Sequence, residues 1–234
     1  MYRIVKAELL DELSPADPRA IRSRSDLRRL NFLMGHGGIL ARAFRLQFDF
    51  PNLPSRPLRV IELGAGDGTL LLRLARVWSS LGMKAEVIFL DRQNLISEET
   101  RRAFASLNWT IDIRTADAFS CLESASLHVD LILANLFLHH FPDGRLCPLL
   151  KRVAAKTDFF LACEPCRSPL ALTAARMLGL IGCNGITRHD AVVSVRAGFV
   201  DHELTALWPK SSEWKTNEQT AGLFSHLFVA KRSA

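Results

Sequence analysis

Two adjacent histidines, His139 and His140, follow an apolar run in the segment DLILANLFLHHFPDG, residues 130–144. The run has the composition of a buried strand, and polar groups at the end of such a strand are costly unless they have a partner. Histidine titrates near neutral pH, so one of these imidazoles could remove the proton of a substrate hydroxyl. Adjacent side chains point in different directions, so we expect at most one of them to face a substrate. The alternative is that both are structural.

A third candidate base is His189, in the segment ITRHDAV. It ends a stretch, residues 164–189, that contains the apolar helical sequence LALTAARMLGLIG. We expect this stretch to be a lid-like insertion that covers the site together with the N-terminal helices. An apolar lid favours a lipophilic substrate, although such apolar stripes also occur in ordinary hydrophobic cores.

The elements that must position these histidines follow a regular alternation after residue 57. Short apolar runs alternate with helical patterns, which predicts a Rossmann-like α/β fold with a mostly parallel sheet. No helical pattern separates the last two runs, so we expect them to pair as a terminal antiparallel hairpin. The expected strands are residues 59–64, 86–91, 110–117, 128–136, 158–165, 203–209 and 225–232.

The first 50 residues have helical patterns instead, and the proline-rich segment PNLPSRP, residues 51–57, marks the best boundary in the chain. We therefore expect an N-terminal helical cap over residues 1–57. The catalytic domain would then comprise residues 58–234.

A glycine-rich turn, VIELGAGDGTLLLRLA at residues 60–75, joins the first expected strand to a helix. Glycines in such a turn allow positive φ and let a ligand approach the backbone. An acidic residue, Asp91, ends the next strand, where a carboxylate can hold ribose hydroxyls. The glycine spacing differs from a dinucleotide fingerprint, and Asp67 at the helix start would repel a pyrophosphate. These features favour a nucleoside ligand without phosphates.

On these motifs the sequence resembles the class I S-adenosylmethionine-dependent methyltransferases over residues 58–232. ELGAGDG is similar to their first motif and LILANLF to their fourth. The resemblance implies methyl transfer from S-adenosylmethionine. It places Asp91 at the ribose, Asp117 beside the adenine amino group, and Asn135 at the methionine end. The cofactor residues that it implies are Glu62, Gly64, Ala65, Gly66, Asp67, Gly68, Asp91, Arg92, Asp117, Ala118, Asn135 and Leu136.

Composition limits the class of protein. Hydrophobic residues make up 48% of the 234 residues, and no apolar run reaches the roughly 18 residues that span a bilayer. The N-terminal sequence lacks the apolar stretch of a signal peptide, so we expect a cytoplasmic protein. The net charge of +6 is concentrated in the N-terminal segment, which is consistent with weak contact to a membrane surface or with a solvated arginine-rich helix face.

The sequence therefore predicts a methyltransferase for a small lipophilic acceptor of phenolic, polyketide or quinone-like type, acting on oxygen. We expect no bound metal, no specific nucleic acid, and a monomer or homodimer. Two alternatives remain open at this point. One is methylation of RNA or protein, and the other is a cofactor-binding partner subunit without catalysis.

Overall fold

A seven-stranded sheet forms the centre of the computed structural model, which describes residues 1–47, 56–124 and 127–233. The strand order is β3-β2-β1-β4-β5-β7-β6. All neighbouring strands are parallel except β7, which runs antiparallel to both β5 and β6. The strands are β1 (Leu58–Leu63), β2 (Ala85–Asp91), β3 (Thr110–Thr115), β4 (Val129–Asn135), β5 (Thr157–Pro165), β6 (Trp214–Ala221) and β7 (Ser225–Arg232). This confirms the predicted Rossmann-like sheet with its terminal antiparallel hairpin.

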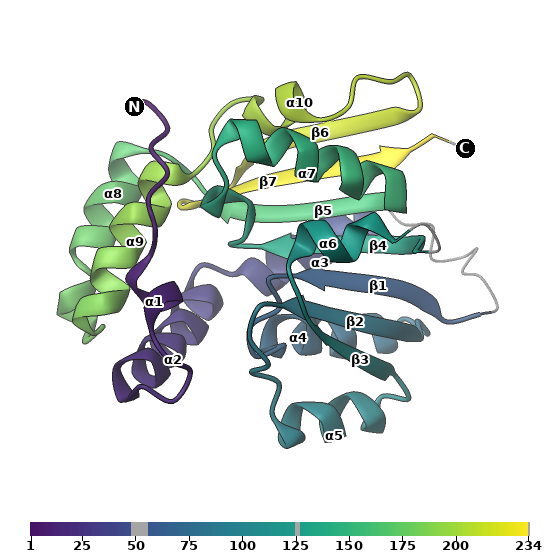
Figure 1. Ribbon diagram of the computed structural model, residues 1–234, viewed down its shortest axis with the longest axis horizontal. Helices are drawn as coiled ribbons and strands as arrows, with labels where there is room; N and C mark the ends of the chain where they lie inside the picture. The colour runs from purple at the N-terminus through teal and green to yellow at the C-terminus, as the bar shows by residue number, and fades with distance from the viewer. Residues whose placement is uncertain (48–55, 125–126, 234) are drawn as a thin grey trace.

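Helices cover both faces of the sheet (Figure 1). On one face α3 (His36–Gln47), α4 (Thr69–Ser79) and α5 (Glu98–Ser106) bury apolar side chains such as Phe44, Trp78 and Phe104. On the other face α6 (Ala118–Glu123), α7 (Asp143–Lys156) and α10 (Glu203–Leu207) close a second apolar cluster. The strands between the two clusters are buried on both sides, which explains their continuous apolar runs.

A third group of helices lies beyond the carboxyl ends of the central strands, at the left of Figure 1. It comprises α1 (Leu9–Glu12), α2 (Pro18–Leu33), α8 (Pro169–Arg176) and α9 (Gly185–Ala197), with a short 3-10 turn, η3 (Leu178–Ile181), after α8. The side chain of Asp17 accepts a hydrogen bond from the Arg19 amide and caps α2, whose first residue is a proline. The boundary predicted at residues 51–57 lies largely outside the described residues.

One predicted strand is wrong. Residues 203–207 form helix α10, because the buried carboxylate of Glu218 accepts hydrogen bonds from the Leu204 and Thr205 amides at the first turn of that helix. The sixth strand lies later, at Trp214–Ala221, on the edge of the sheet. Most of its side chains are exposed, so its sequence is polar and lacks the apolar pattern of the interior strands.

In the part of the chain that the structure describes, no helix has both the length and the apolar character needed to cross a bilayer.

Candidate active site

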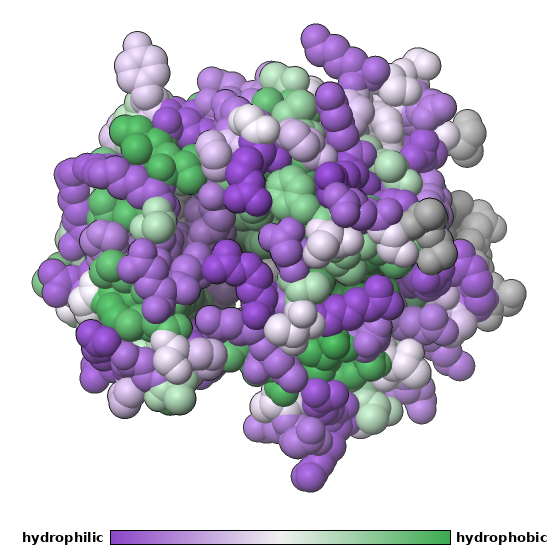
Figure 2. All heavy atoms as spheres, in the orientation of Figure 1, coloured by the Kyte–Doolittle hydropathy of each residue, from purple (hydrophilic) through white to green (hydrophobic). Residues whose placement is uncertain are grey.

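A cavity of about 730 Å³ lies at the carboxyl edge of the sheet. Strands β1 and β4 are neighbours in the sheet, but the chain continues from β1 to β2 on one side and from β4 to β5 on the other. In open α/β sheets, ligands bind at the carboxyl ends of two strands whose connections leave in opposite directions. One wall comes from the loops that follow β1, β2, β3 and β4, and the other from residues 5–12 and helix α2. On the face seen in Figure 2, hydrophilic side chains predominate along the seam between the N-terminal helices and the sheet.

The glycine-rich turn forms part of the cavity wall. Gly64 and Gly66 have φ values of +65° and +54°, which favour glycine. A Cβ on Gly64 would lie 2.5 Å from the Phe137 ring, whereas a Cβ on Gly66 would meet no atom within 4 Å. Gly66 therefore leaves its backbone open to the cavity. Gly68 serves another purpose: it caps α4 with φ +71°, and a Cβ there would lie 2.8 Å from Ile96.

Asp91 connects the end of β2 to this turn. One of its carboxylate oxygens accepts a hydrogen bond of 2.9 Å from the Gly66 amide, and the other accepts one of 2.9 Å from the Gln93 amide. An ionised carboxylate has about four acceptor sites. Asp91 can therefore stabilise the turn and still accept hydrogen bonds from the two hydroxyls of a ribose.

Two buried polar groups beside the turn have atoms without a hydrogen-bond partner among the described residues. They are the Oε2 atom of Glu62 and the Oδ1 atom of Asn135, and both residues line the cavity. Burial, together with the charges of Asp67 and Asp91, raises the pKa of Glu62 well above its usual value. Unsatisfied buried acceptors are costly, and a ligand with a cationic amino group would satisfy them. These residues fit the amino acid end of S-adenosylmethionine.

Eleven of the twelve cofactor residues implied by the sequence line this cavity, and Gly68 does not. Asp117 caps α6 by accepting a hydrogen bond of 2.8 Å from the Phe119 amide. Leu136 has a φ of +53°, an uncommon conformation for a residue with a branched side chain, and its amide donates to the Cys163 carbonyl. The residues that line the cavity are Glu62, Gly64, Ala65, Gly66, Asp67, Asp91, Arg92, Asp117, Ala118, Asn135 and Leu136.

His139 is held between two carboxylates. It lies in the 3-10 turn η2 (Leu138–His140) that follows β4, and its side chain is 3% exposed. The Nδ1 atom lies 2.7 Å from Glu164 and the Nε2 atom 3.3 Å from Glu8. Burial alone would lower the pKa of His139, but the hydrogen bonds to Glu164 and Glu8 outweigh it and raise this pKa to about 9. His139 is therefore an imidazolium at neutral pH.

Glu164 also fixes the backbone of η2. This fully buried residue of β5 accepts hydrogen bonds from the amides of Phe137 and Leu138, at 3.0 and 2.9 Å. Burial by itself would raise the pKa of Glu164, but the charged His139 and these amides lower it. The 3-10 turn is thus held by an ionised carboxylate beneath it.

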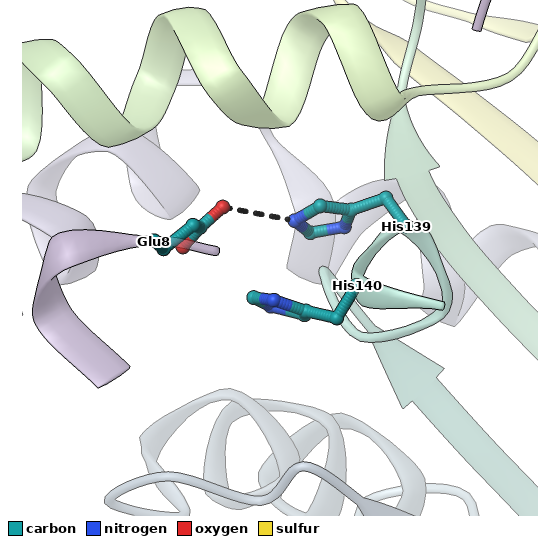
Figure 3. Close-up of side chains that lie close together, drawn as sticks. All are labelled: Glu8, His139 and His140. Carbon is teal, nitrogen blue, oxygen red and sulfur yellow. Dashed lines mark hydrogen bonds and ion pairs between the residues drawn. The ribbon is translucent and has the colours of Figure 1, made fainter. Parts of the chain in front are cut away.

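His140 has a different environment. Its ring stacks beside that of His139, with centroids 4.3 Å apart, and its side chain is 25% exposed and lines the cavity. Burial and the positive charge of His139 lower the pKa of His140. Figure 3 shows the His139 ring pointing at Glu8, while the His140 ring lies beside them. Of the two histidines, His140 is the neutral one that can accept a proton.

Glu8, His139 and His140 also form a group whose ligand-type atoms all lie within 4.8 Å of one another. Such a group has the composition of a metal site. However, both ring nitrogens of His139 face carboxylate oxygens, and the raised pKa keeps both of them protonated. A doubly protonated imidazole has no lone pair for a metal. The hydrogen-bond pattern favours a cluster that holds a proton.

Two sequence expectations differ from this geometry. His189 does not line the cavity; its side chain is 49% exposed and hydrogen-bonds to the neighbouring Asp190. The cavity lining also contains none of residues 164–189, the stretch predicted to be a lid. Helix α8 and the turn η3 pack against α9 instead, and Leu180 of η3 is 79% exposed. The structure places residues 5–12 and α2 over the cavity instead.

Three acidic residues around the histidines had no sequence signal that pointed to them: Glu8, Glu164, and Asp11, whose Oδ2 atom lies 3.6 Å from His140 Nδ1. Glu8 and Asp11 lie about 130 residues before the histidines, and Glu164 is the penultimate residue of a strand that reads as ordinary core. The spacing of Glu8 and Asp11, three residues apart at the start of a helical pattern, places both on one side, but nothing local indicates what they face.

Comparisons with known proteins agree with this geometry. Residues 60–157 match the family model described as "Methyltransferase domain". No curated protein sequence gives a significant match.

Several solved methyltransferase structures are similar at low identity. The mitomycin 7-O-methyltransferase MmcR is 18% identical with a TM-score of 0.61, and the alignment covers 96% of this chain and 60% of that one. The plantazolicin methyltransferase BamL is 11% identical with a TM-score of 0.63, covering 96% and 93%. Magnesium protoporphyrin IX methyltransferase from Synechocystis PCC 6803 is 18% identical with a TM-score of 0.52, covering 85% and 84%.

At this identity the structural similarity establishes the fold, and the chain spans about 60% of the length of MmcR. The family match lies on the strands and the glycine-rich turn that build the cavity. Residues 60–157 therefore form a methyltransferase domain of the class I type, and S-adenosylmethionine is the cosubstrate that such a domain implies.

Proposed function

We propose that this enzyme transfers a methyl group from S-adenosylmethionine to a hydroxyl oxygen of a small lipophilic acceptor of phenolic, polyketide or quinone-like type. The observation that carries the proposal is His140, an imidazole kept neutral on the wall of the cofactor cavity by burial and by the adjacent charge of His139. A neutral imidazole beside the cofactor site is suited to remove the proton of a hydroxyl.

The lining of the cavity supports an acceptor with an apolar body. Val5, Leu10 and Leu27 line it from the N-terminal segment, and Phe137 and Phe141 line it from the loop that carries the histidines. Such pockets are typically apolar with a few polar groups that fix orientation. An aromatic ring could pack among these side chains while its hydroxyl reaches His140.

The residues divide the work of the reaction. Asp91, Asp117 and the glycine-rich turn would hold S-adenosylmethionine, with Glu62 and Asn135 at its amino acid end. When bound, this cosubstrate supplies a methyl carbon that is open to in-line attack. The chain positions the acceptor oxygen against that carbon, which is the main source of rate in such displacements. His140 would accept the hydroxyl proton as the oxygen–methyl bond forms and the methyl–sulfur bond breaks, which leaves S-adenosylhomocysteine, and it would later release the proton to solvent.

Two of the similar structures support a small-molecule acceptor in general. MmcR is a mitomycin O-methyltransferase, and the Synechocystis enzyme acts on magnesium protoporphyrin IX. Both acceptors are small molecules. For this chain, the cavity described above is the support for a small-molecule acceptor.

Two measurements test the proposal. In a thermal-shift screen, S-adenosylmethionine should raise the melting temperature and NAD should not, because ligand at about 100 times Kd stabilises by roughly 2.7 kcal/mol. Mass spectrometry of reactions with a panel of phenols and hydroxyquinones should then identify an O-methylated product. Methylation confined to nitrogen or carbon, or to added RNA or protein, would contradict the proposed acceptor class.

A further inference from the structure

We propose that the N-terminal segment, residues 1–12, belongs to the catalytic machinery. Glu8 and Asp11 are positioning residues, the first holding His139 and the second orienting His140. This inference rests on the proposed role of His140 as the base, and it adds two residues whose roles are to fix the charge of one imidazole and the tautomer of the other.

The segment is docked at a defined place on α9. The Ile4 amide donates a hydrogen bond of 3.0 Å to the Arg196 carbonyl, and the Arg3 guanidinium donates one of 2.9 Å to the Ala197 carbonyl. The Met1 carbonyl accepts a hydrogen bond from Arg167. These contacts fix residues 1–4, although the segment forms no strand.

The same segment is tied to the loop that follows the histidines. Arg3 donates a hydrogen bond of 2.9 Å to the Phe141 carbonyl and forms an ion pair of 2.6 Å with Asp143. The side chain of Arg3 is 11% exposed and lies over the Phe199 ring at 4.4 Å. Arg3 therefore joins the N-terminal segment, α9 and the histidine loop in one contact network.

The start of α1 is held by a buried carboxylate. Asp190 of α9 accepts hydrogen bonds from the amides of Leu9 and Leu10, at 2.9 and 3.0 Å. This contact sets the rotation of α1, and with it the direction of Glu8 and Asp11. Glu8 is the N-cap residue of α1 and Asp11 follows it by three residues, and their carboxylates face His139 and His140 respectively. That spacing matches the two stacked imidazole rings opposite them, whose centroids are 4.3 Å apart.

Glu8 controls the charge of His139. Its side chain is 11% exposed, lies 3.3 Å from His139 Nε2, and accepts a hydrogen bond from the Ser194 hydroxyl. Burial alone would raise the pKa of Glu8, but the hydrogen bond and charge of His139 lower it to about 2. With Glu164 on the other ring nitrogen, His139 has an anion on each side and keeps its proton. Its positive charge then disfavours protonation of His140.

Asp11 faces His140 directly. Its Oδ2 atom lies 3.6 Å from His140 Nδ1, which is beyond a hydrogen bond in the free protein. Catalytic contacts are often long before substrate binds and shorten in the complex. A carboxylate at Nδ1 favours the tautomer with the proton on that atom, so that Nε2 is left as the acceptor. This is the division of roles found in histidine–carboxylate pairs generally.

Burial and the charged groups around His140 set its pKa together. Burial lowers this pKa most and the charge of His139 lowers it further, while Glu8, Asp11 and Glu164 raise it. Burial raises the pKa of Asp11 itself; His140 and Arg92 oppose this shift, and Glu8 and Asp190 add to it. Removing the Asp11 charge should therefore lower the pKa of His140. Removing the Glu8 charge should lower the pKa of His139.

An NMR titration measures the protonation and the tautomer of both histidines without an acceptor. The imidazole nitrogens of ¹⁵N-histidine-labelled protein, saturated with S-adenosylhomocysteine, are followed by NMR as a function of pH in the unchanged protein, in Glu8→Gln and in Asp11→Asn. The control is Glu99→Gln, an exposed carboxylate on α5 that does not line the cavity. We expect a doubly protonated His139 and an Nδ1–H tautomer of His140. Glu8→Gln should lower the His139 pKa and Asp11→Asn the His140 pKa, each relative to Glu99→Gln.

A parallel assay measures the rate of 2-naphthol methylation. Asp11→Asn should lower this rate about 10–100-fold, because loss of the orienting carboxylate removes part of the contribution that a general base makes. An Nε2–H tautomer of His140 in the unchanged protein, or pKa values and rates that neither variant moves, would overturn the inference. A merely structural segment would lower the melting temperature and leave both pKa values unchanged. Failure of the proposed function is distinct, since it would appear as absent O-methylation with the NMR result intact. The tautomer of the unchanged protein decides the case even where a variant does not fold.

Discussion

Arg28 of α2 and Asp67 of the glycine-rich turn form an ion pair of 2.9 Å across the cavity. Asp67 also accepts hydrogen bonds from the amide and hydroxyl of Thr69, at 3.1 and 2.7 Å. An acidic residue at the start of α4 is thus used locally as a helix-terminal acceptor, and its charge is matched by the N-terminal helices. The pair couples the helices that cover the cavity to the turn that would hold the cosubstrate.

The first prediction concerns this pair. Arg28→Gln should weaken S-adenosylmethionine binding by at most about fivefold, because partly exposed ion pairs contribute roughly 0.2–1 kcal/mol. Isothermal titration calorimetry measures the change, with Arg76→Gln on the exposed side of α4 as the matched control. An affinity loss well above tenfold would show instead that Arg28 contacts the cosubstrate itself.

The second prediction concerns Asp91. Asp91→Ala removes a carboxylate that accepts from the Gly66 and Gln93 amides and faces the cavity. Loss of hydrogen bonds to a charged group costs roughly 1.5–3 kcal/mol, so affinity for S-adenosylmethionine should fall about tenfold or more. Asp112→Ala is the control, since that carboxylate lies on the neighbouring strand β3 and pairs with Arg114 away from the cavity. Equal affinities for the two variants would remove Asp91 from the binding site.

The cofactor half of the site could be predicted from sequence because its signals are local. A strand, a glycine turn and a helix follow one another in residues 58–79, Asp91 ends the next strand, and Asp117 lies two residues after the strand that follows. The polar edge strand β6 could not be recognised in the same way, because an exposed edge needs no apolar pattern.

The catalytic half depends on contacts between distant segments. The sequence shows His139 and His140 as equivalent neighbours and offers no means to choose between them. The structure separates them, since Glu164 and Glu8 enclose His139 while His140 lines the cavity. No periodicity around residue 8 indicates that its carboxylate lies against residue 139, so this distinction requires the folded chain.

The third prediction concerns metal. Turnover should be unchanged after treatment with EDTA and exchange into metal-free buffer, because the hydrogen bonds and charge of His139 leave it no lone pair for coordination. Elemental analysis of the purified protein accompanies the assay. Loss of activity that zinc, iron or magnesium restores would reassign Glu8, His139 and His140 as metal ligands.

The fourth prediction concerns stability against pH. The pKa of His139 is raised to about 9, so its contribution is complete below about 6.5, the unfolded value, and is lost as pH rises through 9. The pKa of Glu8 is lowered to about 2, so its contribution is complete above about 4.5 and is lost as pH falls toward 2. The cluster should stabilise the fold most between about pH 4.5 and 6.5.

Melting temperatures of the unchanged protein and of Glu8→Gln, measured from pH 4 to pH 9, check this window. The difference between the two should be largest near pH 5–6 and should shrink as pH rises toward 9, because the charge on His139 is then lost. A difference that stays constant over this range would mean that Glu8 stabilises the fold without an ion pair.

The last prediction concerns His140. His140→Ala should lower the rate of methyl transfer roughly 10²–10⁴-fold, the usual contribution of a general base, and leave affinity for S-adenosylmethionine nearly unchanged. The rate of the unchanged enzyme should rise with pH through an apparent pKa below 6.5, because burial and His139 lower the pKa of His140 and only the neutral ring accepts a proton. That rise should disappear in His140→Ala.

His189→Ala is the matched control, because His189 is exposed and outside the cavity, and its rate and pH profile should match those of the unchanged enzyme. His139→Ala should behave differently again: it leaves Glu164 buried without its cation, so it should lower the melting temperature and the yield of folded protein. Full turnover in His140→Ala would mean that the acceptor reaches the site already ionised and that proximity alone provides the catalysis.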